Sequence, residues 1–340
     1  MSSLVPDFDV QRVLVTPWTS DATMNGWIVL MGFLVATTCG WVGQYLLLRR
    51  MALMGDALSH SILPGLAGAF LIASFLNPGT ADGAGNARGA TVMYLGALAA
   101  ALVTTLLIHW LHTASRVKQD AAIGIVFSGL FALGVILITV FADQVDLDAD
   151  CVLYGEIGTV GFTDYFQLSG RDVAPLPVAR MAIVALLTFA WIQLFYKELL
   201  VSSFDPGLAS SLGIRANWVH GVLMLWLSVV IVSAFESVGA ILVVAMLIVP
   251  GATASLLSTS LPRIFSLIVL HAAISSLFGL HLALWLDCSI AGAMVVTGCG
   301  LFVLAWLSHV IRVRRARHAS LPQDAPPGTL ASPSVTPNPP

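Results

Sequence analysis

The chain has 340 residues, of which 58% are hydrophobic and only 10% are charged, and its formal net charge is −3. Its mean hydropathy is +0.91. A soluble core of this length does not need so many apolar residues, so the composition excludes a soluble globular protein and indicates a polytopic membrane protein. We expect the lipid bilayer to be its main environment and no nucleic acid to be a partner.

Nine apolar segments have the length of about 20 residues that a helix needs to cross a bilayer. They cover residues 24–48, 52–76, 90–111, 121–141, 178–196, 217–235, 240–258, 264–285 and 290–310. The first is too long for the core of a signal peptide, and Arg12 is the only Lys or Arg before Arg49. We therefore interpret it as a true span. The sequence predicts an all-α fold with about eight or nine transmembrane helices, preceded by an outer N-terminal segment, residues 1–23.

The cations predict the orientation of these spans. If the N-terminus is outside and the C-terminus inside, eleven of the 15 Lys and Arg residues lie on the inner side. The reverse topology would violate the positive-inside rule. Most acidic residues then lie outside, where they would raise the local concentration of cations or simply solvate the loops.

The second span contains an acid and an imidazole four residues apart, Asp56 and His60. On a helix this spacing places both side chains on one face. An Asp in a membrane helix costs about 2.5–3.5 kcal/mol on insertion scales, so it normally faces a cavity or a partner. Pro64 has no N–H group and leaves the carbonyl of His60 without its usual helical partner. A carboxylate, an imidazole and a free carbonyl are a plausible transient site for a divalent metal ion.

A simpler interpretation of the same residues stays open from their spacing alone. Asp56 and His60 could pair with each other, or they could cap a helix that starts after Gly55.

Residues 204–213 predict a short helix between two spans on the inner side. Asp205 is a typical N-cap, Pro206 suits the first helical position, and Gly213 suits the C-terminal stop. Two leucines four residues apart form one apolar face, which could contact a partner or lie on the lipid surface. They are Leu208 and Leu212.

A second proline lies inside the span 240–258. Pro250 frees the carbonyl of Met246, and a Pro-broken span in each half of a transporter points to the transport path. We therefore predict that helix breaks at Pro64 and Pro250 line this path. Glu236 lies at the turn before this span. It is either a further metal ligand or a solvated residue of a short outer turn.

The C-terminal residues 312–340 form a basic cluster followed by a Pro-rich polar tail. The cluster suits the inner membrane face, and residues 318–340 have no core-forming pattern, so we predict a disordered cytoplasmic tail. The membrane domain proper covers residues 24–311.

Three catalytic or nucleotide-binding motifs are absent from the sequence. It contains no G-x-x-x-x-G-K-[ST] loop for nucleotide phosphates, no H-E-x-x-H metalloprotease motif and no G-x-S-x-G nucleophile elbow. We therefore predict that the chain is not an enzyme. If ATP drives transport, another polypeptide hydrolyses it.

Three stretches together resemble the permease subunits of metal-ion ABC importers, the manganese, zinc and iron family. They are residues 50–65, residues 197–213 and residues 238–254, in the same order and spacing. The resemblance covers residues 24–310. It implies a fold similar to the cobalamin-importer permease, in the bacterial inner membrane, with a second permease chain around a central path, either as a homodimer or with a paralogue.

The resemblance also implies partners and roles. Two cytosolic ATP-binding subunits would dock on the short helix, and an extracytoplasmic metal-binding protein would deliver the ion. The metal would pass Asp56 and His60 as cargo, with no permanently bound cofactor. The residues expected to couple the chain to the ATP-binding subunits are Phe204, Asp205, Pro206, Leu208, Ala209, Leu212 and Gly213.

Two hypotheses follow for the activity. The first is an ATP-driven importer that moves Mn(II), or else Zn(II) or Fe(II), by alternating access. The acidic approach to residues 154–157 resembles the manganese and iron branch. The second is a secondary, proton-coupled transporter of metal or a small solute, in which Asp56 and His60 relay protons.

Overall fold

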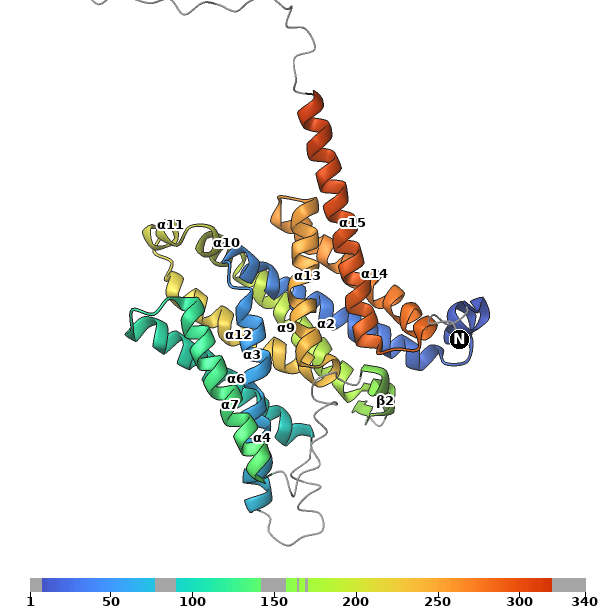
Figure 1. Ribbon diagram of the computed structural model, residues 1–340, viewed down its shortest axis with the longest axis horizontal. Helices are drawn as coiled ribbons and strands as arrows, with labels where there is room; N and C mark the ends of the chain where they lie inside the picture. The colour runs from blue at the N-terminus through green and yellow to red at the C-terminus, as the bar shows by residue number, and fades with distance from the viewer. Residues whose placement is uncertain (1–7, 77–89, 142–156, 164, 169–170, 320–340) are drawn as a thin grey trace, which may run out of the picture.

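The computed structural model describes residues 8–76, 90–141, 157–163, 165–168 and 171–319 (Figure 1). Within these residues, eight helices are long and apolar enough to cross a membrane, and a shorter apolar helix covers Leu242–Leu257. The predicted all-α membrane fold with eight or nine spans is therefore confirmed.

The membrane helices agree with the predicted spans to within a few residues at most ends. They are α2 (Ala22–Leu48), α3 (Leu53–Ser61) with α4 (Leu63–Leu76), α6 (Ala90–Ala114), α7 (Gln119–Phe141), α9 (Leu176–Leu194), α12 (Ala216–Val238), α13 (Ala240–Leu257), α14 (Leu261–Leu286) and α15 (Ile290–Ala319). The shorter elements are η1 (Gln11–Val15), α1 (Thr16–Thr19), η3 (Ile157–Phe162), the antiparallel strands β1 (Tyr165–Leu168) and β2 (Arg171–Pro175), α10 (Tyr196–Phe204) and α11 (Pro206–Ser211).

Helix α2 lies at the centre of one group of helices, in contact with α9, α12, α13 and α14. Its closest neighbour is α13. A Cβ atom on Gly43 would overlap the carbonyl oxygen of Leu247, so the two backbones touch at this point. Lipid tails are as apolar as leucine, so close packing of small residues replaces the hydrophobic effect as the force between membrane helices.

Helices α3, α4, α6 and α7 form a second group, which lies to one side of α2 in Figure 1. Here α4 and α6 cross at two glycines. A Cβ on Gly65 would overlap the backbone of Gly96, and a Cβ on Gly96 would overlap the side chain of Ala69. Small residues again allow the backbones to approach closely.

The two ends of the described chain lie on opposite faces of the bundle. Arg12, before α2, lies 3.9 Å from Asp287 at the end of α14. At the other end of α2, Gln44 donates a 3.2 Å hydrogen bond to Ser255 near the end of α13. Helix α15 starts beside Asp287 and runs back along α14 and α13, away from the N-terminal end (Figure 1). Which face is cytoplasmic stays a prediction.

Some predictions concern residues outside the described ranges. They include the acidic approach to residues 154–157 and most of the tail. Helix α15 continues beyond the predicted span through the basic cluster to Ala319, so the cluster is helical. Of the predicted disordered segment, only His318 and Ala319 are described, and both belong to α15.

Two glycines of α2 test the contact with α13. We expect Gly43→Ala to destabilise the protein by about 1–3 kcal/mol, because the added methyl group overpacks the interface. Gly26→Ala is the matched control. No atom lies within 4 Å of the position that a Cβ would occupy there, so the substitution should be neutral or stabilise the helix by about 0.5–1 kcal/mol. The measurement is the free energy of unfolding in mixed detergent micelles, and equal effects of both variants would contradict this packing.

Candidate metal and coupling sites

The predicted break in the second span is present. Helix α3 ends at Ser61 and α4 begins at Leu63, with Ile62 between them. The carbonyl of Ile62 accepts from the N–H groups of Gly65 at 2.9 Å and Leu66 at 3.1 Å. The interruption lies just before Pro64, whose ring lies against Gly134 of α7. Proline at the second position of α4 is tolerated, because an N–H there has no helical partner.

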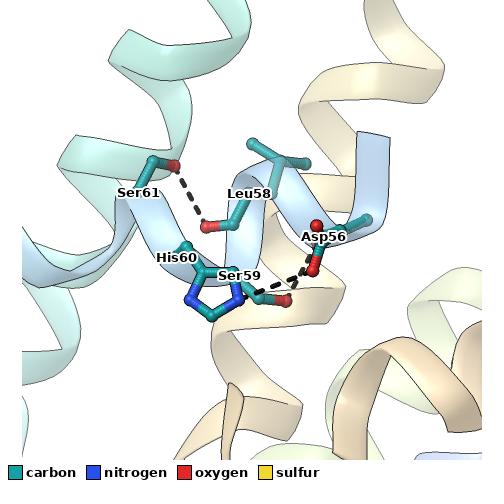
Figure 2. Close-up of polar contacts among 6 residues, drawn as sticks. Asp56, Leu58, Ser59, His60 and Ser61 are labelled. Carbon is teal, nitrogen blue, oxygen red and sulfur yellow. Dashed lines mark hydrogen bonds and ion pairs between the residues drawn. The ribbon is translucent and has the colours of Figure 1, made fainter. Parts of the chain in front are cut away.

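Asp56 and His60 are both on α3, and their side chains contact each other (Figure 2). His60 Nε2 lies 3.5 Å from Asp56 Oδ1, which is long for a strong hydrogen bond. The Asp56 side chain is 51% exposed and the His60 side chain 24% exposed. The ring of His60 packs against two rings of α7, Phe127 at 5.6 Å and Phe131 at 5.9 Å between centroids.

The hydroxyl groups beside this pair, on Ser59 and Ser61, are buried. Ser59 donates to the carbonyl of Gly55 at 2.9 Å, and Ser61 donates to the carbonyl of Leu58 at 3.0 Å, so both bond to their own helix. Within the described residues, no group of three or more His, Cys, Asp or Glu side chains could hold a metal ion. The described residues of one chain therefore offer a carboxylate and an imidazole, fewer ligands than the four to six that divalent metals take.

The other predicted path residues lie on α12 and α13. Glu236 is in the last turn of α12, and its side chain lies outside the described part of the structure. Pro250 does not break its helix, because α13 runs without interruption from Ala240 to Leu257. That prediction is wrong. The ring of Pro250 is buried beside Gly40 of α2, where a Cβ would lie 3.1 Å away.

Helix α13 nevertheless contacts the helix that carries the Asp56–His60 pair. A Cβ on Gly55 would overlap the side chain of Leu247. The same leucine underlies Gly43 of α2, so a single residue of α13 supports both α2 and α3. The structure thus brings the segment before Pro250 next to Asp56.

The short helix predicted over residues 204–213 is present as α11, and its caps are those that the sequence predicts. Asp205 accepts hydrogen bonds from the N–H groups of Gly207 at 2.9 Å and Leu208 at 3.0 Å. Pro206 is the first helical residue. Gly213 has a φ of +79°, a left-handed conformation that glycine adopts without cost.

Helix α11 lies at the edge of the molecule (Figure 1), and apolar side chains in and beside it are exposed. Ala209 is fully buried and anchors the helix. Phe204, Leu208 and Leu212 are 65%, 51% and 62% exposed. Exposed apolar side chains on a short, well-capped helix fit both alternatives stated for this segment, contact with a partner protein and contact with the lipid surface.

One polar cluster was not recognised in the sequence. Arg49, at the end of α2, contacts Ser202 and Ser203 of α10 and His220 of α12. Burial of its guanidinium lowers the pKa of Arg49 from its ordinary value. The sequence shows a cation at the end of a span, but contacts between residues more than 150 positions apart leave no local signal.

Comparison with known proteins gives consistent matches over most of the chain. Residues 21–309 match the model of the ABC 3 transport family. The manganese transport system membrane protein MntD of Bacillus subtilis is 42% identical over 272 residues, which cover 80% of this chain and 88% of that protein. The zinc transport system membrane protein TroD of Treponema pallidum is 38% identical over 282 residues, 82% of this chain and 72% of that protein.

A solved structure agrees with these matches. A chain in the structure of PsaBC from Streptococcus pneumoniae in complex with Fab superposes with a TM-score of 0.68 at 30% identity. The match covers 88% of this chain and 95% of that chain. The chain therefore belongs to the ABC 3 transport family, as a multi-pass permease of the bacterial inner membrane.

Proposed function

We propose that this chain is the permease subunit of an ATP-driven importer of divalent metal ions, with Mn(II) as its substrate. The observation that carries the proposal is the half-exposed Asp56–His60 pair on the interrupted second span of an ABC 3 family permease. Relatives named as manganese transport proteins support the choice of Mn(II). The relative named for zinc transport makes Zn(II) the first competitor. Fe(II) is the third candidate, from the sequence alone.

The incomplete ligand set supports an assembly of two permease chains. One pair supplies one oxygen-type and one nitrogen-type ligand, while two chains around a common path supply two of each. The two carboxylates suit Mn(II), and the two imidazoles suit the competing ions Zn(II) and Fe(II). Glu236 is proposed as a further ligand near the end of α12. The exposed oxygen of Asp56 is then directed to the partner chain and not to lipid.

Release of the ion requires a site that binds weakly. A long contact between Asp56 and His60 allows the two groups to return to each other when the metal leaves. We propose that the ion is held briefly while the path opens first to one side and then to the other. Zinc binds most such sites more tightly than manganese does. Selectivity therefore also depends on the extracytoplasmic protein that delivers the ion.

The energy source is proposed to be ATP, hydrolysed on two separate cytosolic subunits. Family membership favours this hypothesis over the proton-coupled alternative. The exposed leucines of α11 supply a docking surface that a secondary transporter does not need. In this arrangement residues 1–23 lie outside, residues 24–311 form the permease domain, and residues 312–340 form the cytoplasmic tail.

Substitutions on α3 test the metal pair. We expect Asp56→Ala and His60→Ala each to lower uptake of radioactive Mn²⁺ into proteoliposomes at least tenfold, because each removes a ligand from both chains of the pore. Both variants should still assemble with the ATP-binding subunits. Ser59→Ala is the control on the same helix, since its hydroxyl bonds only to Gly55, and its uptake should be normal. Normal uptake by both site variants would refute the site.

Substitutions on α11 test the docking surface. We expect Leu208→Asp and Leu212→Asp to reduce co-purification of the ATP-binding subunit at least tenfold, because each buries a charge in an apolar contact. Ser210→Asp places the same charge about half a turn away on the helix and should have little effect. Full Mn²⁺ uptake by the Leu212→Asp variant, with no ATP-binding subunit bound, would instead support the proton-coupled hypothesis.

A further inference from the structure

The side chain of Arg49 joins three helices at one end of the bundle. Its Nε donates to Ser203 Oγ at 3.1 Å and its Nη2 donates to Ser202 Oγ at 2.9 Å, both on α10. Its Nη1 lies 3.0 Å from His220 Nδ1 on α12. Arginine has no acceptor, so His220 accepts here and is neutral. Gln119 of α7 lies 3.5 Å from the other ring nitrogen of His220, which adds a fourth helix to the cluster.

This arrangement uses the planar fork of arginine in a way that other side chains cannot reproduce. Three different guanidinium nitrogens have three different acceptors, whereas a lysine has one nitrogen at the end of a flexible chain. No carboxylate among the described residues lies within ion-pair distance of Arg49. A half-buried cation held only by neutral groups is costly to desolvate, and neutral side chains could join these helices at lower cost. The half-buried charge and the planar guanidinium of Arg49 therefore suggest a role beyond packing.

The two serines of the Arg49 cluster are directly connected to α11 through the chain. Ser202 and Ser203 are in the last turn of α10, and only Phe204 separates them from Asp205, the N-cap of α11. Leu199, one turn earlier, is fully buried and fixes α10 to the bundle. A displacement of α11 therefore reaches the two serine hydroxyls through a continuous, well-anchored segment, which we name the coupling segment (residues 196–213).

The backbone that follows Arg49 leads to α3, which carries the Asp56–His60 pair. Arg50 has a φ of +59°, and the N–H of Met51 donates to the carbonyl of Leu46 at 2.9 Å, so a tight turn closes α2. Met51 and Met54 are buried after this turn, and Met54 N–H donates to Met51 carbonyl at 3.1 Å. Helix α3 begins within this segment, at Leu53. The turn from Arg49 to α3 is therefore short, hydrogen-bonded and anchored by buried side chains.

From this geometry we propose that Arg49 is a positioning residue that makes the coupling segment and α3 move as one body. Motion of an ATP-binding subunit on α11 passes through Ser202 and Ser203 to Arg49, and from there through the closed turn to Asp56 and His60. The inference rests on the proposed function. It adds the element by which ATP hydrolysis changes the metal site.

The first test is hydrogen–deuterium exchange of the permease complex in detergent, with and without its ATP-binding subunit. In the wild-type protein, docking should slow exchange at least threefold both in the coupling segment and in residues 49–58. In Arg49→Met, docking should slow exchange only in the coupling segment. If both regions still respond together in Arg49→Met, the proposal is wrong. If the subunit does not dock on the wild-type chain, the proposed function fails first, and this inference fails with it.

The second test is the number of Mn²⁺ ions taken up per ATP hydrolysed in proteoliposomes. We expect Arg49→Met to lower this ratio at least tenfold with basal ATP hydrolysis within twofold of wild type, and Arg49→Lys to restore little of it. Arg116→Met, at an exposed cation between α6 and α7, is the control and should keep the wild-type ratio.

A variant that keeps Arg49 covers the case in which Arg49→Met does not fold. Ser202→Ala with Ser203→Ala removes two acceptors and retains the contact with His220. This double variant should show the same lower ratio of uptake to hydrolysis. A wild-type ratio in it, or in a folded Arg49→Met variant, overturns the proposal.

Discussion

Backbone contact between α2 and α13 is the constraint on which the rest of the structure depends. In a bilayer no hydrophobic force brings helices together, so they stay together where small residues allow close contact. Gly43 of α2 meets the carbonyl of Leu247, and Gly55 of α3 meets its side chain. One residue of α13 therefore fixes both the end of the central helix and the start of the helix with the acid and the imidazole.

Charge is scarce in this chain, and two charged side chains near the bundle have unusual environments. Asp56 keeps half of its surface exposed in a protein that spans a membrane, and it contacts a histidine on the same helix. Arg49 is half-buried among hydroxyl groups and an imidazole. Neutral side chains would occupy both positions at a lower desolvation cost. Both residues belong to the connection that runs from α11 through Arg49 to α3. The structure thus concentrates its costly groups where the proposed transport cycle would use them.

Local features were predictable from the sequence, and contacts between distant segments were not. The caps of α11 depend on Asp205 and Gly213 within one short stretch, so their residue types were sufficient. The spacing of Asp56 and His60 placed them on one face for the same reason. An interruption is present at Pro64, which lies in the first turn of α4, but not at Pro250, which lies inside the continuous α13, and the residue type alone does not distinguish the two cases. The cluster around Arg49 depends entirely on which helices become neighbours, and no pattern in a single sequence records that.

The length of α15 has a consequence for the whole assembly. Its 30 residues span about 45 Å, roughly 15 Å more than the hydrocarbon layer. The end of α15 is on the same face as α11, because α13 and α2 both finish there. A helix that carries Arg312, Arg314 and Arg315 therefore extends past the hydrocarbon layer on the same face as α11. A protein seated on α11 meets an aqueous face that already carries this basic extension, so its surface charge must be compatible with several arginines.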